Sequence, residues 1–190
     1  MGAAHLTLAS ASPRRRELLG RLGLAPDAVT PADIDETPLK NELPRAYAMR
    51  MGREKALAVE APGFVLAGDT VVAVGRRILP KTETESEARA CLDLISGRRH
   101  QVLTSVVLRA PDGTLRERLS ETVVCFKRLC AQEIADYLAG GDWQGKAGGY
   151  AIQGSAEGLI QWIRGSHSGV MGLPLYETRA LLKAAGFPIA

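Results

Sequence analysis

Three adjacent arginines stand near the start of the chain, directly after Ser12-Pro13 in the run LTLASASPRRREL. Serine followed by proline is typical of a helix N-terminus, with the serine as N-cap and the proline as first helical residue. Such an N-terminus exposes unpaired backbone N–H groups and the positive end of the helix dipole, which both attract anions. The residues from Ser12 onward therefore predict an anion site.

The three arginines cannot all serve such a site. Successive residues of a helix are rotated by about 100°, so we expect Arg14 and Arg15 to face a ligand and Arg16 to face solvent. The alternative is a solvated basic turn that pairs with Glu17. The spacing alone leaves both interpretations open.

Asp69 lies between small or polar residues in the apolar stretch FVLAGDTVVAVG, residues 64–75. The pattern predicts two β-rich runs broken at Gly68-Asp69-Thr70, so that Asp69 follows a buried strand. Reactive groups of α/β folds are commonly presented at such a strand end. A carboxylate there could orient or deprotonate water, and a simple turn cap is the alternative.

Two lysines and an acidic loop could complete a phosphate and metal site. Lys55 and Lys81 stand alone in weakly charged surroundings, and a lysine ammonium meets a phosphate as a compact charge. The acids Asp33, Asp35 and Glu36 could hold Mg²⁺, which prefers oxygen ligands and keeps several waters together with substrate phosphates. Solvated lysines and an acidic surface loop are the alternatives.

The elements that must position these residues alternate between strands and helices, which favours an α/β fold. Thr84 and Glu87 fit a capping box, and the APDG segment predicts a hairpin turn. The predicted strands, besides the runs of residues 64–75, are residues 5–9, 101–109 and 115–126. The predicted helices are residues 13–22, 44–59, 84–97, 131–138 and a closing helix within 172–186. The glycine-dense segment GDWQGKAGGYAIQGSAEG indicates backbone held close to a ligand.

Composition limits the possible classes of protein. The 190 residues are 46% hydrophobic, which supports one domain over residues 1–190. The chain carries 24 Lys and Arg against 21 Asp and Glu, so the one-sided field of a general nucleic-acid binder is not expected. No apolar run approaches the roughly 20 residues that cross a bilayer. Cys91, Cys125 and Cys130 form no CxxC pair and are expected to be reduced core residues. The ASA segment, residues 9–11, resembles a signal cleavage site, but the positive cluster follows the apolar stretch and does not precede it, so a cytoplasmic location is expected.

Several segments of the chain match one family pattern, in the family's order, from residue 6 to about residue 183. They read LASASPRRRELL, DIDE, REKA, AGDTVV, the lysine of ILPK, LISGRRHQVLTSV, GKAGGYAIQG and GSHSGVMGLPL. On these segments the chain resembles the Maf family of nucleoside triphosphate pyrophosphatases. The resemblance implies a single mixed α/β domain, similar to inosine triphosphatases, with a central curved sheet and two lobes around a cleft. It also implies a homodimer.

The same resemblance implies a reaction and the residues that perform it. A nucleoside triphosphate is cut between its α and β phosphates, giving the monophosphate and pyrophosphate, with a divalent metal, Mg²⁺ or Mn²⁺. Asp69 matches the catalytic aspartate, taken as the proton acceptor for the attacking water, and Glu36 matches an acid that would hold the metal. The residues that match the phosphate cleft are Ser12, Arg14, Arg15, Lys55 and Lys81.

Three positions, Arg14, Thr70 and Gln153, resemble the family branch that acts on dTTP and UTP. A side-chain amide offers one acceptor and one donor, which complement the N3–H and O4 of thymine or uracil. A carboxylate would suit the donor edge of guanine better. The expected substrates are therefore dTTP and UTP, or modified pyrimidine nucleotides that share this edge.

Two other classes of function remain open. Maf proteins are also linked to inhibition of septum formation, so a nucleotide-binding regulator of cell division is the main alternative. A nucleic-acid module that uses Arg14, Arg15 and Arg16 is the other, and the balanced charge disfavours it.

Overall fold

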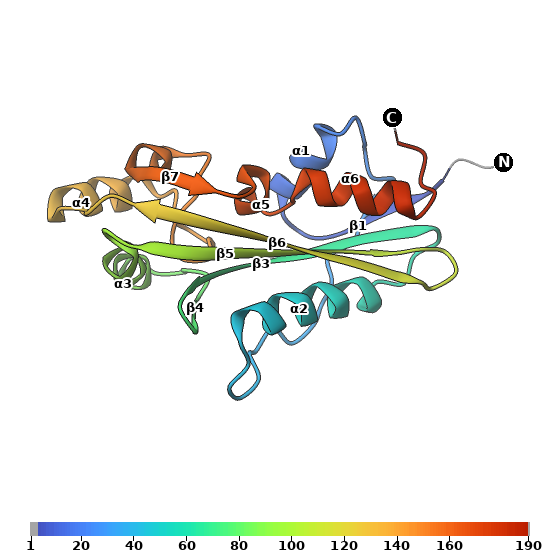
Figure 1. Ribbon diagram of the computed structural model, residues 1–190, viewed down its shortest axis with the longest axis horizontal. Helices are drawn as coiled ribbons and strands as arrows, with labels where there is room; N and C mark the ends of the chain where they lie inside the picture. Colours follow the sequence, from blue (N-terminus) through green and yellow to red (C-terminus); the bar gives the residue numbers. More distant parts are fainter. Residues whose placement is uncertain (1–3, 190) are drawn as a thin grey trace.

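A long twisted sheet forms the centre of the computed structural model, which describes residues 4–189 (Figure 1). The strands are β1 (Leu6–Ala9), β2 (Ala28–Val29), β3 (Phe64–Val74), β4 (Arg77–Leu79), β5 (Arg99–Arg109), β6 (Leu115–Phe126) and β7 (Ile160–Arg164). Within the described residues these seven strands form one sheet in the order β2-β1-β3-β5-β6-β7, and β4 pairs with β3 outside this path. The pairs that β1 makes are parallel and all others are antiparallel, so the predicted mixed α/β fold is confirmed.

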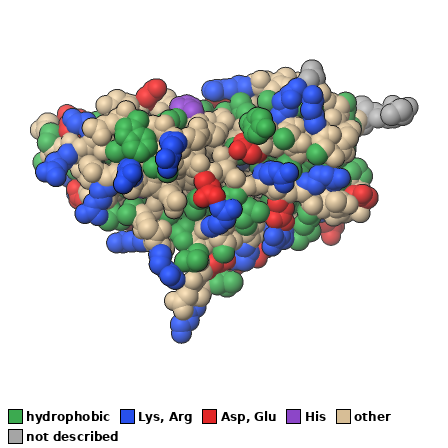
Figure 2. All heavy atoms as spheres, viewed as in Figure 1, with side chains coloured by type: hydrophobic (Ala, Val, Ile, Leu, Met, Phe, Trp, Pro, Cys, Tyr) green, Lys and Arg blue, Asp and Glu red, His purple; other side chains and the backbone are tan. Residues whose placement is uncertain are grey.

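Helices cover both faces of the sheet. They are α1 (Pro13–Gly20), α2 (Pro44–Ala58), α3 (Glu85–Ile95), α4 (Ala131–Gly140), α5 (His167–Met171) and α6 (Leu175–Ala184). In Figure 1, α2 lies along one face, while α1, α5 and α6 lie along the other. Basic, acidic and apolar side chains are interspersed on the face shown in Figure 2. The turn that precedes α2 projects from the lower edge of this view.

The alternation of side chains along β3 divides the core into two parts. Val65 and Val71 pack in apolar clusters beneath α2. Leu66 and Val72 pack in a larger cluster on the opposite face, together with leucines of α1 and α6. The same alternation sends odd-numbered side chains of β3 toward α2 and even-numbered ones toward α1.

Most predicted elements are confirmed, with small shifts of their ends. Thr84 and Glu87 form the predicted capping box at the start of α3, and β5 and β6 form the predicted hairpin. Helix α1 ends at Gly20, two residues before the predicted end, and a turn leads to Gly23, which has a φ of 72°.

The predicted break at Gly68-Asp69-Thr70 is wrong, because β3 runs unbroken through these residues. Each of the three keeps its partner on β5, where Asp69 lies opposite Ser105. Gly68 is required there, since a Cβ atom would lie only 2.7 Å from the Ser105 carbonyl oxygen. Asp69 therefore lies in the middle of a strand and not at its end.

The sheet nevertheless has a gap beside Asp69. Strand β1 pairs with β3 only as far as Ala67, and β4 pairs with β3 only from Val72 onward. In the described chain, residues 68–71 of β3 thus have a strand partner on the β5 side alone. Asp69 and Thr70, which point to opposite faces, can both reach into this opening.

The cysteines agree only in part with the prediction. All three are free, but Cys91 alone is buried, Cys125 is half-buried and Cys130 is exposed, because Cys130 occupies the N-cap of α4. None of the described helices is both long and apolar enough to span a bilayer.

His100 makes the stability of the fold depend on pH. Its ring on β5 is 2% exposed, Nε2 lies 2.7 Å from the Tyr150 hydroxyl, and Nδ1 has no partner among the described residues. Burial lowers the pKa of His100 to about 4, so the folded chain keeps the ring neutral where the unfolded chain, with a histidine pKa near 6.5, takes up a proton. The contribution of neutral His100 to the free energy of unfolding is fully present above about pH 6.5. It decreases by about 3 kcal/mol as the pH falls toward 4.

Urea unfolding of the parent and of His100→Gln between pH 7 and pH 4 measures this effect. The free energy of unfolding of the parent should fall by about 3 kcal/mol more than that of the variant over this range. Parallel pH profiles would show that His100 does not titrate with folding.

Candidate active site

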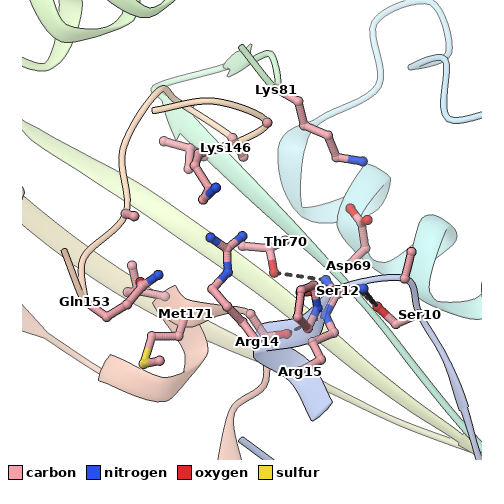
Figure 3. Close-up of a pocket in the computed structure, with 18 of the residues that line it drawn as sticks. Ser10, Ser12, Arg14, Arg15, Asp69, Thr70, Lys81, Lys146, Gln153 and Met171 are labelled. Carbon is pink, nitrogen blue, oxygen red and sulfur yellow. Dashed lines mark hydrogen bonds between the residues drawn. The ribbon is translucent and has the colours of Figure 1, made fainter. Parts of the chain in front are cut away.

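A cavity of about 910 Å³ opens at the gap in the sheet (Figure 3). Its walls come from residues 9–15, from β3, from the glycine-dense loop 141–154 and from residues 170–172. Nine residues predicted for the site line this cavity: Ser12, Arg14, Arg15, Glu36, Lys55, Asp69, Thr70, Lys81 and Gln153. Of the three acids of the predicted loop, only Glu36 does so, and the exposed Asp33 and Asp35 lie outside the lining.

Asp69 is held in place by Lys55 from α2. The Lys55 ammonium donates to Asp69 Oδ1 at 2.7 Å, and both side chains are buried. The Asp69 backbone N–H donates to Ser105 Oγ at 3.1 Å. Gly52, one turn before Lys55, lets α2 come this close, because a Cβ atom there would lie 2.4 Å from Ser105 Oγ.

Lys55 also joins Asp69 to Glu36. The Lys55 ammonium lies 2.8 Å from Glu36 Oε1, and Lys81 donates to Glu36 Oε2 at 2.8 Å. Partial burial alone would raise the pKa of Glu36, but the hydrogen bonds from the two lysines outweigh it and lower the pKa to about 2. Glu36 is therefore ionised at neutral pH, and the two carboxylates face one opening with an ammonium between them.

The loop that carries Glu36 is tied to α2 by two further side chains. Tyr47 donates its hydroxyl to the Glu36 carbonyl oxygen at 2.7 Å. Arg50 donates to both carboxylate oxygens of Glu42 at 2.7 Å and to the Thr37 carbonyl oxygen at 3.2 Å. These contacts fix an otherwise irregular segment beside the cavity.

Arg15 is half-buried and hydrogen-bonded to other groups of the protein. Its guanidinium donates to the Gly172 carbonyl oxygen at 2.8 Å, to Ser10 Oγ at 3.0 Å and to Thr70 Oγ1 at 3.3 Å. Burial lowers the pKa of Arg15, while the nearby charge of Asp69 acts in the opposite direction. Arg15 thus joins the start of α1 to β3 and to the loop before α6, and its charge still faces the cavity.

Ser12 and Arg14 stand at the start of α1, as predicted. Ser12 occupies the N-cap and Pro13 follows as the first helical residue, but the Ser12 side chain makes no capping hydrogen bond. Arg14 extends into the cavity in Figure 3, and burial lowers its pKa. Arg16 is exposed and does not line the cavity, as expected for the arginine that faces solvent.

Gln153 belongs to the glycine-dense loop 141–154, and the prediction that this loop approaches a ligand site agrees with its place in the cavity wall. Gly148 and Gly149 have φ values of 69° and 70°. A Cβ atom on Gly148 would lie 2.7 Å from Val72, and one on Gly149 would lie 3.2 Å from the backbone of Ala88. Because Gly148 and Gly149 have no side chain, the loop can pack closely against β3 and α3, and this packing sets the position of Gln153.

Sequence reasoning missed three polar residues of this region. Ser10 and Lys146 line the cavity, and Ser105 supports Asp69 from β5. Lys146 is the one lysine of the glycine-dense segment, a signal that the sequence contained. The serines carried no comparable signal, because their roles depend on strand pairing.

The chain matches the model of the family described as Maf-like protein over residues 5–185. It is 64% identical over 188 residues to the dTTP/UTP pyrophosphatase of Novosphingobium aromaticivorans, a match that covers 97% of this chain and 94% of the relative. It is 60% identical over 185 residues to the dTTP/UTP pyrophosphatases of Rhodospirillum rubrum and Caulobacter vibrioides, covering 96% of this chain and 88% and 96% of those relatives.

A solved structure shares the fold at much lower identity. The HAM1 protein from Coxiella burnetii has a TM-score of 0.51 and 14% identity, covering 95% of this chain and 99% of that chain. The likeness extends along almost the whole sheet and its helices. Because the family model and the relatives both span nearly the entire chain, the protein belongs to the Maf family.

Proposed function

We propose that this protein is a nucleoside triphosphate pyrophosphatase that acts on dTTP and UTP. It cuts the bond between the α and β phosphates and releases the nucleoside monophosphate and pyrophosphate. The observation that carries the proposal is a buried carboxylate, Asp69, beside a cavity with cationic walls, in a chain 64% identical to a protein named for this activity.

Asp69 serves as the proton acceptor for the attacking water. Its Oδ1 accepts from Lys55, which leaves Oδ2 to orient a water molecule toward the α phosphorus. Lys55 and Lys81 offset the negative charge that develops on the leaving pyrophosphate, and Arg14, Arg15 and the start of α1 hold the triphosphate.

The residues present suit a divalent cation that arrives with the nucleotide. Among residues 4–189 no group of three or more His, Cys, Asp or Glu side chains is arranged so that it could hold a metal ion. Asp69 and Glu36 together offer two carboxylates at one opening, and Mg²⁺ is commonly bound through one or two carboxylates plus substrate phosphates. Such an ion, Mg²⁺ or Mn²⁺, would neutralise phosphate charge and acidify the attacking water when bound.

Gln153 reads the pyrimidine base through its amide, with Arg14 and Thr70 nearby in the cavity wall. Exchange of Gln153 for Glu should lower kcat/KM for dTTP and UTP relative to GTP by roughly tenfold, since the O4 acceptor loses its donor. The matched control is Gln144→Glu, which adds the same charge to the same loop and cavity wall. An unchanged order of substrates would mean that the base is recognised elsewhere.

A panel of nucleoside triphosphates, assayed for released pyrophosphate with Mg²⁺ or Mn²⁺, tests the proposal. We expect dTTP and UTP to be the preferred canonical substrates, and modified pyrimidine nucleotides that keep the N3–H and O4 edge to be accepted as well. Binding of nucleotides without release of pyrophosphate at micromolar protein would instead support the regulator of septum formation. A cytoplasmic location and a homodimer remain expectations, and sedimentation tests the latter.

A further inference from the structure

Five cationic side chains line the cavity, and they differ in what neutralises them. Lys55 and Lys81 are paired with carboxylates. Arg15 donates to three neutral acceptors of the protein. Arg14 and Lys146 differ from these, because no carboxylate among the described residues lies within ion-pair distance of either side chain. The Lys146 ammonium donates to the carbonyl oxygen of Gln144.

Arg14 and Lys146 point toward one another across the cavity in Figure 3. Burial, and after it the charge of Arg14, lower the pKa of Lys146, although the charge of Asp142 acts in the opposite direction. Arg14 Nε is buried and has no hydrogen-bond partner. Two like charges are thus held together in a half-enclosed space, which is unfavourable for the ligand-free protein.

Hydrogen bonds to neighbouring segments fix the backbone of Lys146 in the cavity wall. The Lys146 carbonyl oxygen accepts from the Thr82 N–H at 3.2 Å, the Thr82 hydroxyl at 3.3 Å and the Gly149 N–H at 3.0 Å. The Lys146 N–H donates to the Trp143 carbonyl oxygen at 3.1 Å. Only the side chain can therefore relax, and its ammonium is already fixed at 2.7 Å from the Gln144 carbonyl oxygen.

We propose that Lys146 is a further substrate-binding residue, which together with Arg14 clamps one phosphate group of the polyphosphate tail. The inference rests on the proposed function for the identity of the anion. A phosphate placed between the two side chains would receive a planar guanidinium from one side and a compact ammonium from the other. It would also remove the repulsion between the two cations. The gain in binding free energy is therefore larger here than at Lys55 and Lys81, which already have carboxylate partners.

This clamp is separate from the cluster of Asp69, Lys55 and Glu36. The clamp contains no carboxylate, so it holds its phosphate without a metal ion, whereas the acidic cluster suits the metal. One phosphate group of the tail would therefore bind between Arg14 and Lys146, while the reacting phosphate lies beside the Asp69 cluster.

The experiment measures binding of inorganic pyrophosphate by calorimetry, with and without Mg²⁺, together with the melting temperature of each ligand-free protein. The variants are Lys146→Met, which removes the charge and keeps a similar stem, and Lys146→Arg, which keeps the charge. Lys40→Met is the control, because Lys40 is exposed and does not line the cavity.

Lys146→Met should weaken pyrophosphate binding by roughly tenfold or more, as expected for loss of a charge-assisted hydrogen bond, while its ligand-free melting temperature stays the same or rises. Lys146→Arg should bind within about threefold of the parent, and Lys40→Met should match the parent. If Lys146 had only a structural role, Lys146→Met would lower the melting temperature of the ligand-free protein.

Equal affinity of the parent and Lys146→Met for pyrophosphate would overturn the inference, as would a parent that does not bind pyrophosphate at all. Weaker binding with a lower melting temperature that Lys146→Arg does not restore would overturn it as well. None of these measurements depends on nucleotide turnover. A parent that binds pyrophosphate through Lys146 but releases none from any nucleotide would refute the proposed enzyme and leave the clamp intact.

Discussion

Replacement of Asp69 by Asn is expected to lower turnover of dTTP by roughly a hundred- to ten-thousandfold while nucleotide binding persists. The amide keeps the volume of the carboxylate but cannot accept a proton from water. The fold should tolerate the change, because Lys55 retains Glu36 as a partner at 2.8 Å. Single-turnover release of pyrophosphate, together with calorimetric titration of the nucleotide, separates the chemical step from binding.

The control for this variant is Asp35→Asn on the acidic loop. Asp35 is exposed, lies outside the cavity and accepts from the Thr37 N–H, a contact that an asparagine oxygen can also make. Its turnover should equal that of the parent. If Asp69→Asn retains turnover within about threefold of the parent, Asp69 is not the proton acceptor.

Replacement of Lys55 by Met is expected to damage both stability and turnover. The Lys55 and Asp69 side chains are 9% and 6% exposed, so removal of the ammonium leaves a carboxylate buried without its partner. Breaking a buried pair in this way costs about 3 to 5 kcal/mol in the free energy of unfolding. Urea unfolding measures that loss, and release of pyrophosphate should fall by at least about a hundredfold, because Asp69 and Glu36 are no longer held together.

Lys81→Met is the matched comparison, because it removes the other lysine bound to Glu36. The Lys81 side chain is 54% exposed, so its ion pair should contribute at most about 1 kcal/mol to stability. The double variant Lys55→Met, Asp69→Asn should recover part of the loss seen with Lys55→Met, since the buried charge is then gone. Equal destabilisation by Lys55→Met and Lys81→Met would contradict the structural importance of the buried pair.

Local chemistry explains which elements could be predicted from the sequence. The capping box of Thr84 and Glu87 marks the start of α3, and the APDG turn separates β5 from β6, because both signals act over a few residues. The short elements β2, β4 and α5 carry too few residues for a periodic pattern, so no prediction was possible for them.

The contacts that build the site act over longer distances and left no local pattern. Gly68 reads as a break, yet it is the residue that lets β3 continue past the backbone of β5. Arg15 donates a hydrogen bond to the Gly172 carbonyl oxygen, 157 residues away in the chain, and Asp69 forms an ion pair with Lys55 of another element. The family resemblance brought these residues together as a set, but only the fold shows which are paired with one another and which, like Arg14, have no carboxylate partner among the described residues.

The gap in the sheet bears on how relatives with other substrates could arise. At residues 68–71 the strand that carries Asp69 is anchored by β5, while residues 10–15 and the loop 141–154 line the cavity on its other side. Neither segment supplies a strand partner for residues 68–71, so both can change in sequence without disturbing the strand pairing of Asp69 and Thr70 with β5. Substrate preference can therefore diverge while Asp69, the proposed proton acceptor, keeps its place on β3.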